Sequence, residues 1–269
     1  MARVETGLRR TLRLARVAVH LALGLLLVEL LYPLLRRETR MAIRARWCRH
    51  MLSLLGVRLR VSGPVTFGCH LIASNHVSWL DVFAIGAMFP CWFVSKAETR
   101  AWPVVGWLAA ANETLFLRRR SPRAAYRMNA KIRARLGAGQ SVVIFPEGTT
   151  TDGSRVLPFY PALFQPAVDG GHRILPMAVC YRDPAGNRVA AAAYIDDDPL
   201  WKSLRAVLEA PAIEAHLVLD DALAAAGRSR RELAARACGA VTRLHRQHGV
   251  AEAFDEECAE RVSPLLNSA

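Results

Sequence analysis

The chain has 269 residues, a formal charge of +13 and 52% hydrophobic residues. This length allows one or two domains with a buried core, and the composition excludes a disordered chain. Its mean hydropathy of +0.16 is high for so basic a chain. Soluble nucleic-acid-binding domains are usually basic and hydrophilic, so the combination points instead towards an anionic membrane surface.

An apolar run occupies residues 17–35, with arginines on both sides. Its length is at the lower limit for crossing a bilayer, and Pro33 should kink or end a helix there. No small-residue cleavage site follows, which argues against a signal peptide. We expect a membrane-associated helix that either spans the bilayer or lies in its interface; the alternative is a buried core helix.

A second helix is predicted from Met41 onward, because apolar residues recur there at steps of three and four. Arg44, Arg46 and Arg49 lie between them. The pattern predicts an amphipathic helix with a cationic face, which suits either solvent or a membrane surface.

From Arg58 onward, short β-type runs alternate with helical runs. Strands are predicted at 57–61, 70–74, 92–96, 114–117, 141–145, 174–181, 189–195 and 213–219. Helices are predicted near 79–88, 102–111, 122–137, 162–169, 199–208 and 228–247, and the tail from Ala251 should begin as a helix. The alternation predicts an α/β fold with a mixed, largely parallel sheet flanked by helices.

The six cysteines are widely spaced and form no C-x-x-C pair. This spacing argues against a zinc site or a disulfide framework and favours small, buried thiols in a reducing compartment. They are Cys48, Cys69, Cys91, Cys180, Cys238 and Cys258. The chain also lacks a P-loop, a dinucleotide fingerprint, a G-x-S-x-G elbow and an H-E-x-x-H motif, so we expect neither a metal nor a bound cofactor.

The segment SNHVSWLD stands between a predicted strand and a predicted helix. Within one continuous helix, His76 and Asp81 would point about 140° apart. If His76 lies in the turn before the helix, Asp81 can accept from one imidazole nitrogen and leave the other as a base. A single histidine near an aspartate is usually structural, so the other motifs decide between the two interpretations.

Three further segments contain residue types suited to a ligand. FPEGTT follows the strand 141–145, at the strand end where open α/β sheets bind ligands, although proline and glycine also make an ordinary turn. Arginines 118–120 follow the strand 114–117, where guanidinium groups suit phosphate or carboxylate; for Arg120 we prefer a solvated edge. Pro176 stands in an apolar strand, which is unusual for a central strand.

Together and in this order, the four segments resemble the blocks of the glycerophosphate and lysophospholipid acyltransferase family, over roughly residues 55–220. NHVSWLD matches the first block, TLFLRR the second, FPEGTT the third and ILPMAV the fourth. Glu113, Arg118 and Thr150 depart from the usual family pattern, which bears on the acceptor headgroup. HVSWLD with EGTT-x-DG is most similar to the bacterial branch that includes lyso-ornithine lipid O-acyltransferases; the alternative is a 1-acylglycerol-3-phosphate acyltransferase.

The resemblance implies transfer of a fatty acyl group from a thioester to a lysolipid hydroxyl in membrane lipid biosynthesis. His76 would be the general base and Asp81 its orienting partner. The implied substrate-binding residues are Phe116, Arg119, Glu147, Gly148, Thr149 and Pro176. Glu147 would accept from an acceptor hydroxyl or hold Arg119, and acyl-carrier protein or acyl-CoA would supply the acyl group.

We expect membrane-associated helices at 1–56, an acyltransferase catalytic domain at 57–220 and a helical extension at 221–269. The expected location is the cytoplasmic face of a bacterial inner membrane, with an anionic membrane as partner. The alternative is a non-catalytic basic protein that binds a membrane surface or nucleic acid, through a basic helix such as 228–247. Because a binder has no need of ordered His, Arg and Glu blocks, we expect no nucleic-acid partner.

Overall fold

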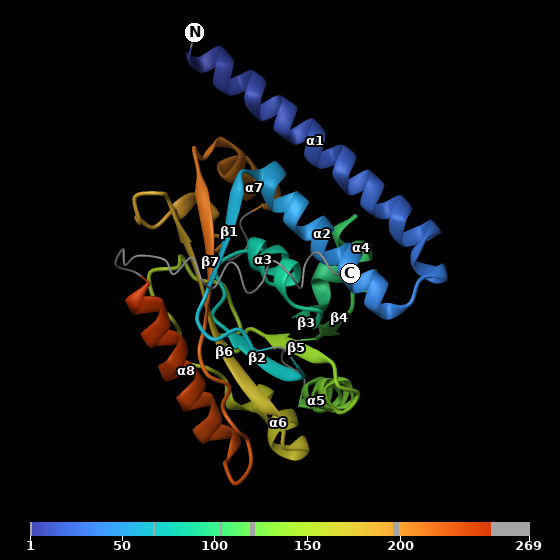
Figure 1. The fold of residues 1–269 in the computed structure, drawn as a ribbon, viewed down its shortest axis with the longest axis vertical. Helices are drawn as coiled ribbons and strands as arrows, with labels where there is room; N and C mark the ends of the chain where they lie inside the picture. The colour runs from blue at the N-terminus through green and yellow to red at the C-terminus, as the bar shows by residue number, and fades with distance from the viewer. Residues whose placement is uncertain (1, 67, 103, 119–121, 196–198, 249–269) are drawn as a thin grey trace.

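The computed structural model describes residues 2–66, 68–102, 104–118, 122–195 and 199–248, and shows a seven-stranded sheet with helices on both faces (Figure 1). The strands are β1 (Val57–Ser62), β2 (His70–Ser74), β3 (Cys91–Lys96), β4 (Thr114–Leu117), β5 (Ser141–Ile144), β6 (Arg173–Arg182) and β7 (Ile213–Leu219). Their order is β1-β7-β6-β2-β5-β3-β4. Only β6 and β7 pair antiparallel; the other pairs are parallel. The predicted fold class is therefore confirmed.

The helices are α1 (Ala2–Leu30), α2 (Arg37–Leu55), α3 (Leu80–Met88), α4 (Val105–Ala111), α5 (Pro122–Gly137), α6 (Gln165–Gly170), α7 (Leu200–Glu209) and α8 (Arg230–Gln247). Single 3₁₀ turns occur at η1 (Tyr32–Leu34), η2 (Ala97–Ala101), η3 (Pro161–Phe164) and η4 (Ala190–Ala192). The helix predicted beyond Ala251 lies outside the described residues.

The helices form two layers because successive strand residues face opposite sides of the sheet. Ile72 of β2 packs in a core with α2, α3 and α7, to which α1 adds Val17. Its neighbours Leu71 and Ala73 pack in a second core with α5, α6 and α8. The central strands are buried on both faces, as continuous apolar runs of this kind require.

The strand predicted at 189–195 is wrong. Val189 is followed by the 3₁₀ turn η4 and then by extended chain without a strand partner. Four consecutive alanines offer little of the side-chain packing that stabilises a strand. The segment instead lies across the end of the sheet, where Tyr194 N donates to Val77 O at 2.9 Å.

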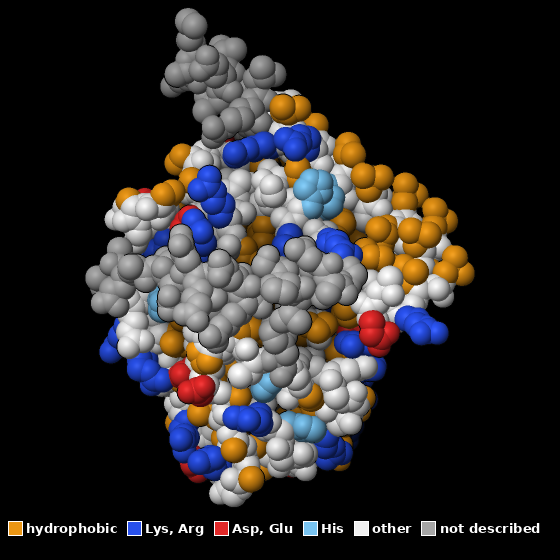
Figure 2. Space-filling model, in the orientation of Figure 1, with side chains coloured by type: hydrophobic (Ala, Val, Ile, Leu, Met, Phe, Trp, Pro, Cys, Tyr) orange, Lys and Arg blue, Asp and Glu red, His pale blue; other side chains and the backbone are white. Residues whose placement is uncertain are grey.

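The N-terminal helix ends where the sequence predicts, because Pro33 lies in η1 directly after α1. Residues 11–30 are long and apolar enough to cross a membrane, and only 22% of that window is buried. Leu23, Leu26 and Leu30 are each more than half exposed. Figure 2 shows hydrophobic side chains gathered on the surface around the C-terminal end of α1. The alternative of a buried core helix is therefore wrong for the described chain.

The cationic face predicted for α2 is wrong at Arg44, which is buried. Its guanidinium donates to Cys91 O at 2.8 Å, Phe89 O at 3.0 Å and Asn112 O at 3.3 Å. Phe89 and Asn112 cap the C-terminal ends of α3 and α4, where unpaired carbonyls attract a cation. Arg46 is exposed and Arg49 is half-buried.

The five described cysteines are all free thiols. Cys48, Cys91 and Cys180 are buried as expected, whereas Cys69 and Cys238 are only half-buried; Cys258 lies outside the described residues. Burial raises the pKa of the Cys48 thiol to about 12, so this side chain stays a neutral, apolar part of the core.

Candidate active site

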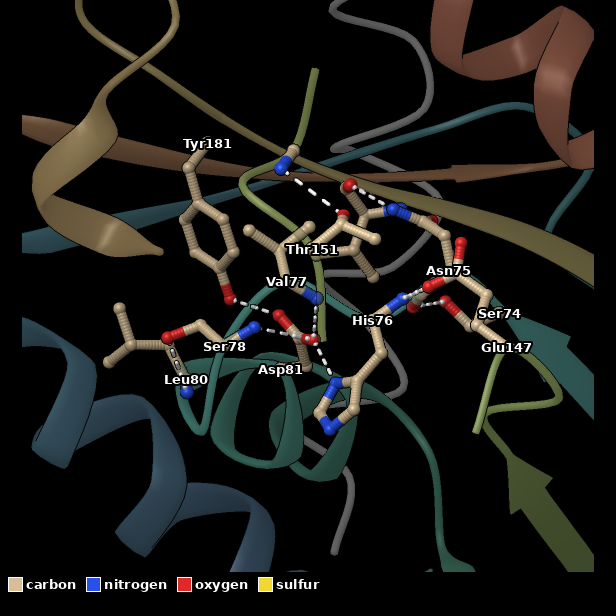
Figure 3. Close-up of polar contacts among 12 residues, drawn as sticks. Ser74, Asn75, His76, Val77, Ser78, Leu80, Asp81, Glu147, Thr151 and Tyr181 are labelled. Atoms are coloured by element: carbon tan, nitrogen blue, oxygen red, sulfur yellow. Dashed lines mark hydrogen bonds and ion pairs between the residues drawn. The ribbon is translucent and has the colours of Figure 1, made fainter. Parts of the chain in front are cut away.

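His76 and Asp81 lie in contact at the carboxyl end of the central strand β2, where α3 begins (Figure 3). His76 lies in the turn between them, so its ring folds back over the first turn of α3. Its Nδ1 lies 2.6 Å from Asp81 Oδ2, which confirms the predicted contact. Because a carboxylate only accepts, Nδ1 bears the hydrogen in this pair.

Asp81 is fully buried and accepts four hydrogen bonds. Besides His76, its Oδ2 accepts from Val77 N at 2.9 Å and from Ser78 N at 3.1 Å. Its Oδ1 accepts from the Tyr181 hydroxyl at 2.6 Å. Burial, followed by the charge of Asp81, raises the pKa of Tyr181 well above its usual value, so this hydroxyl remains a donor. These donors fix the carboxylate and compensate its loss of water.

The His76 ring is held flat against Phe145, with ring centroids 4.0 Å apart and planes 15° apart. About a fifth of the side chain remains exposed. Among the described residues, none forms a hydrogen bond with Nε2, and this nitrogen points away from Asp81 in Figure 3. Nε2 therefore presents a lone pair to a neighbouring molecule, as a general base must.

Glu147 holds the backbone around His76 in place. Its Oε2 accepts from His76 N and its Oε1 from Leu157 N, each at 2.9 Å. Thr151 N donates to His76 O, also at 2.9 Å, so the loop after β5 binds both backbone polar groups of His76. Burial raises the pKa of Glu147 to about 7, although the two N–H donors act in the opposite direction.

Asn75 joins the same turn to β6. Its Nδ2 donates to Val179 O at 2.9 Å, and its Oδ1 accepts from Val179 N at 2.7 Å. The side-chain amide thus replaces a strand partner beyond the end of β2, and it is fully buried. The position of the His76 ring is therefore set by Asp81, by the loop after β5 through Glu147, and by β6 through Asn75.

A cavity of about 580 Å³ adjoins His76. Most of the side chains that line it are apolar. Those from α1, α2, α3 and α7 include Val17, Leu21, Trp47, Met51, Phe83 and Leu204. Gly148 and Thr149 line it on the side of the loop after β5. Gly148 has a φ of +72°, and a Cβ there would lie 3.1 Å from the Tyr160 ring, so glycine suits this turn. The cavity therefore suits an apolar chain whose reactive end lies beside His76.

Two other predicted site residues, Phe116 and Pro176, do not line this cavity. Phe116 in β4 is half-buried and lies under the guanidinium of Arg100, 5.7 Å from its ring centroid, and does not line the cavity. Pro176 is buried in β6 beside Ala73, also away from the cavity lining. Its position is tolerated because pairing with β7 begins one residue later, at Met177. Arg119 lies outside the described residues.

Sequence reasoning missed Tyr181 and the structural part played by Asn75. Tyr181 ends an apolar strand, where a tyrosine is an ordinary core residue, so no spacing rule marks it. Asn75 had a signal, since a polar side chain directly after a buried strand must find partners. Among the described residues, no group of three or more His, Cys, Asp or Glu side chains is arranged to hold a metal ion.

The arrangement is a His–Asp pair beside an apolar cavity, and a pair of this kind can activate a hydroxyl. A hydroxyl near Nε2 can lose its proton to the ring while Asp81 stabilises the imidazolium that forms. An acyl group is the kind of substrate that needs both parts: an apolar space for its chain and a base for the attacking oxygen.

Comparison with known proteins identifies the family of the chain. Residues 62–180 match the family model described as Acyltransferase. The chain is 37% identical over 248 residues to a lyso-ornithine lipid O-acyltransferase of Pseudomonas aeruginosa, covering 90% of this chain and 93% of that protein. It is 40% identical over 150 residues to a 1-acyl-sn-glycerol-3-phosphate acyltransferase of Neisseria meningitidis, covering 55% of this chain and 59% of that protein.

A solved structure shares the fold. The crystal structure of the 1-acyl-sn-glycerophosphate acyltransferase PlsC from Thermotoga maritima superimposes with a TM-score of 0.68 at 19% identity. The match covers 94% of this chain and 100% of that chain. At this identity the likeness concerns the fold alone.

Proposed function

Because the chain belongs to the acyltransferase family that includes the lyso-ornithine lipid and 1-acyl-sn-glycerol-3-phosphate enzymes, we propose that it acylates a lysolipid in membrane lipid biosynthesis. The acyl group would come from a thioester and go to a hydroxyl of the acceptor. The observation that supports this most is the His76–Asp81 pair, whose second ring nitrogen adjoins an apolar cavity.

In the proposed mechanism, Nε2 of His76 takes the proton from the acceptor hydroxyl as that oxygen attacks the thioester carbonyl. The tetrahedral intermediate then collapses, the carbon–sulfur bond breaks, and the leaving thiolate takes the proton back from the imidazolium. Asp81 stabilises the imidazolium and is itself held by Tyr181 and two backbone N–H groups. General-base catalysis of this kind is worth about 10²–10⁴ in rate.

The substrates are assigned to the surroundings of His76. The acyl chain would occupy the apolar cavity, and Gly148 and Thr149 would line the path of the acceptor. Arg119 would bind an anionic group of the acceptor headgroup. Glu147, whose oxygens accept from His76 N and Leu157 N, would act mainly as a positioning residue. The reaction needs only the two substrates, with acyl-carrier protein or acyl-CoA as donor.

The exposed leucines of α1 support a location at a membrane, where a lysolipid acceptor is found. We place the catalytic site on the cytoplasmic side, because acyl thioesters are made there. As acceptor we propose a lyso-ornithine lipid, since the relative that matches along 93% of its length bears that name.

Lipid analysis of a bacterial host with and without this gene tests the proposal. Deletion should cause one lysolipid to accumulate, and return of the gene should restore the acylated product. The purified enzyme should then acylate lyso-ornithine lipid in preference to 1-acylglycerol-3-phosphate. The reverse preference would overturn the choice of acceptor, and no acylation of either lipid would overturn the proposed function.

A further inference from the structure

A second cavity, of about 690 Å³, lies where the C-terminal end of α2 meets α1, β1 and the turn before β7. Four arginines line it: Arg13 from α1, Arg49 from α2, and Arg58 and Arg60 from β1. No acidic residue lines it, and none of these arginines lines the cavity beside His76. This arginine pocket is therefore separate from the site described above.

Two of the four arginines in this pocket have no acidic partner among the described residues. Arg60 pairs with Glu214 at 3.1 Å. Within the part of the chain that the structure describes, no acidic side chain lies within ion-pair distance of Arg49 or Arg58. Burial, followed by the charge of Arg46, lowers the pKa of Arg49, which is the effect of a partly desolvated cation among other cations. A bound anion would offset both the partial desolvation of Arg49 and its repulsion by neighbouring cations.

The backbone shapes the pocket around one of these guanidinium groups. Arg13 Nη1 donates to Leu208 O at 3.3 Å, which fixes the side chain across the end of α2. Gly56 caps α2 with a φ of +78°, and a Cβ there would lie 3.1 Å from Arg13 Nη1. Because Gly56 has no side chain, the guanidinium can lie against this turn and border the cavity.

The walls and the neighbourhood of the pocket indicate what kind of anion fits. Leu52, Val57 and Pro211 line the pocket together with the arginines, and this mixed lining suits an amphiphile better than a fully hydrated ion. Leu12 and Leu14, which flank Arg13 in α1, are 58% and 47% exposed. The arginines therefore adjoin the exposed apolar surface of α1, where a lipid headgroup would be found.

We propose that the arginine pocket binds the phosphate group of a membrane phospholipid that is not a reactant. Arg13, Arg49 and Arg58 contact the phosphate, and the apolar walls contact the glycerol backbone. The lipid would anchor α1 and α2 to the sheet at the membrane surface. The proposal rests on the proposed membrane contact of α1 and does not depend on the chemistry at His76.

The test is a titration of the full chain, purified in a non-ionic detergent, with phosphatidylglycerol, read by native mass spectrometry as lipid bound per chain. We expect saturation at one lipid per chain. Arg49→Gln/Arg58→Gln should bind this lipid about 25-fold more weakly, because each arginine contributes to anionic-lipid binding. Arg127→Gln/Arg133→Gln on α5 is the matched control, since it removes the same charge from exposed positions outside the pocket.

Three results would overturn the proposal: no bound lipid, binding that does not saturate, or equal binding by the pocket variant and the wild type. Displacement of the lipid by inorganic phosphate or coenzyme A at equal concentration would assign the pocket to a soluble phosphate instead. Acyl transfer measured on the same samples keeps the two proposals apart. A wild-type chain that binds the lipid but transfers no acyl group would contradict the proposed function only. A wild-type chain that transfers an acyl group but binds no lipid would contradict the pocket only.

Discussion

At the scale of single residues, Asp81 is where the polar contacts of the site converge. It accepts from the His76 ring, from two backbone N–H groups and from Tyr181, and it is closed off from solvent. A carboxylate held in this way keeps its direction, which is what an imidazole needs in order to gain a proton during a reaction.

Tyr181→Phe should lower kcat about tenfold and leave KM within about twofold, because it removes a bond to an ionised group without touching the cavity. Steady-state kinetics on the purified enzyme measures both constants. Tyr126→Phe, at an exposed position on α5, is the control. A folded Tyr181→Phe enzyme with unchanged kcat would show that the hydroxyl has only a structural part.

Glu147→Gln should change how stability depends on pH. The pKa of this carboxyl is raised from 4.5 to about 7, so the native state holds the proton more tightly than the unfolded state does. Its contribution is therefore fully present below pH 4.5 and is lost as the pH rises through about 7, amounting to about 3 kcal/mol.

Urea unfolding of the wild type and of Glu147→Gln, from below pH 4.5 to above pH 7, measures this effect. The difference between their unfolding free energies should change across that interval. The exposed Glu232→Gln is the control and should follow the wild type. A parallel course for wild type and Glu147→Gln would contradict the raised pKa.

At this scale the sequence predicted what is local and missed what is distant. His76 and Asp81 lie within one turn and the start of one helix, so local geometry makes their contact predictable once the other motifs favour it. Tyr181 and Leu157 reach the site only because β6 and the loop after β5 meet the end of β2 in the folded sheet. No local pattern encodes those two contacts.

At the scale of elements, Arg44 links α2 to the ends of α3 and α4 through buried carbonyl groups. Arg44→Met should lower the free energy of unfolding by about 3 kcal/mol, because it leaves those carbonyls without a donor. Denaturant unfolding at neutral pH measures the loss. Arg127→Met on the exposed face of α5 should change stability by less than about 0.5 kcal/mol, and an equal loss in both variants would contradict the role of Arg44.

Most helices and strands followed from periodicity, whereas two interpretations failed for reasons of packing. The alanines after Val189 do not form the predicted strand, because their small side chains do not stabilise one. Arg44 does not lie on a cationic face, because helix ends elsewhere in the chain direct their carbonyls at it, and residue spacing cannot show this. The strand order is not predictable either, because β7, the last strand in the sequence, lies between β1, the first, and β6.

At the scale of the whole molecule, α1 presents an apolar surface that the other described residues do not cover. Replacing Leu23, Leu26 and Leu30 together by glutamine should move the protein from the membrane fraction towards the soluble fraction. These side chains are exposed and do not line the cavity beside His76, so the folded domain should keep its thermal midpoint.

Cell fractionation followed by immunoblotting measures this redistribution. Trp201→Gln is the control, because it removes one large exposed apolar side chain from α7. If the triple variant stays with the membrane as the wild type does, the leucines of α1 are not what holds the protein there.

The central proposal is that His76 is the general base of acyl transfer to a lysolipid. The most direct measurement is the rate of acyl transfer by purified His76→Ala, with acyl-carrier protein and acyl-CoA thioesters as donors and both lysolipids as acceptors. We predict a rate about 10²–10⁴-fold below that of the wild type, with an unchanged thermal midpoint. A folded His76→Ala enzyme with near-normal turnover would contradict the proposed mechanism.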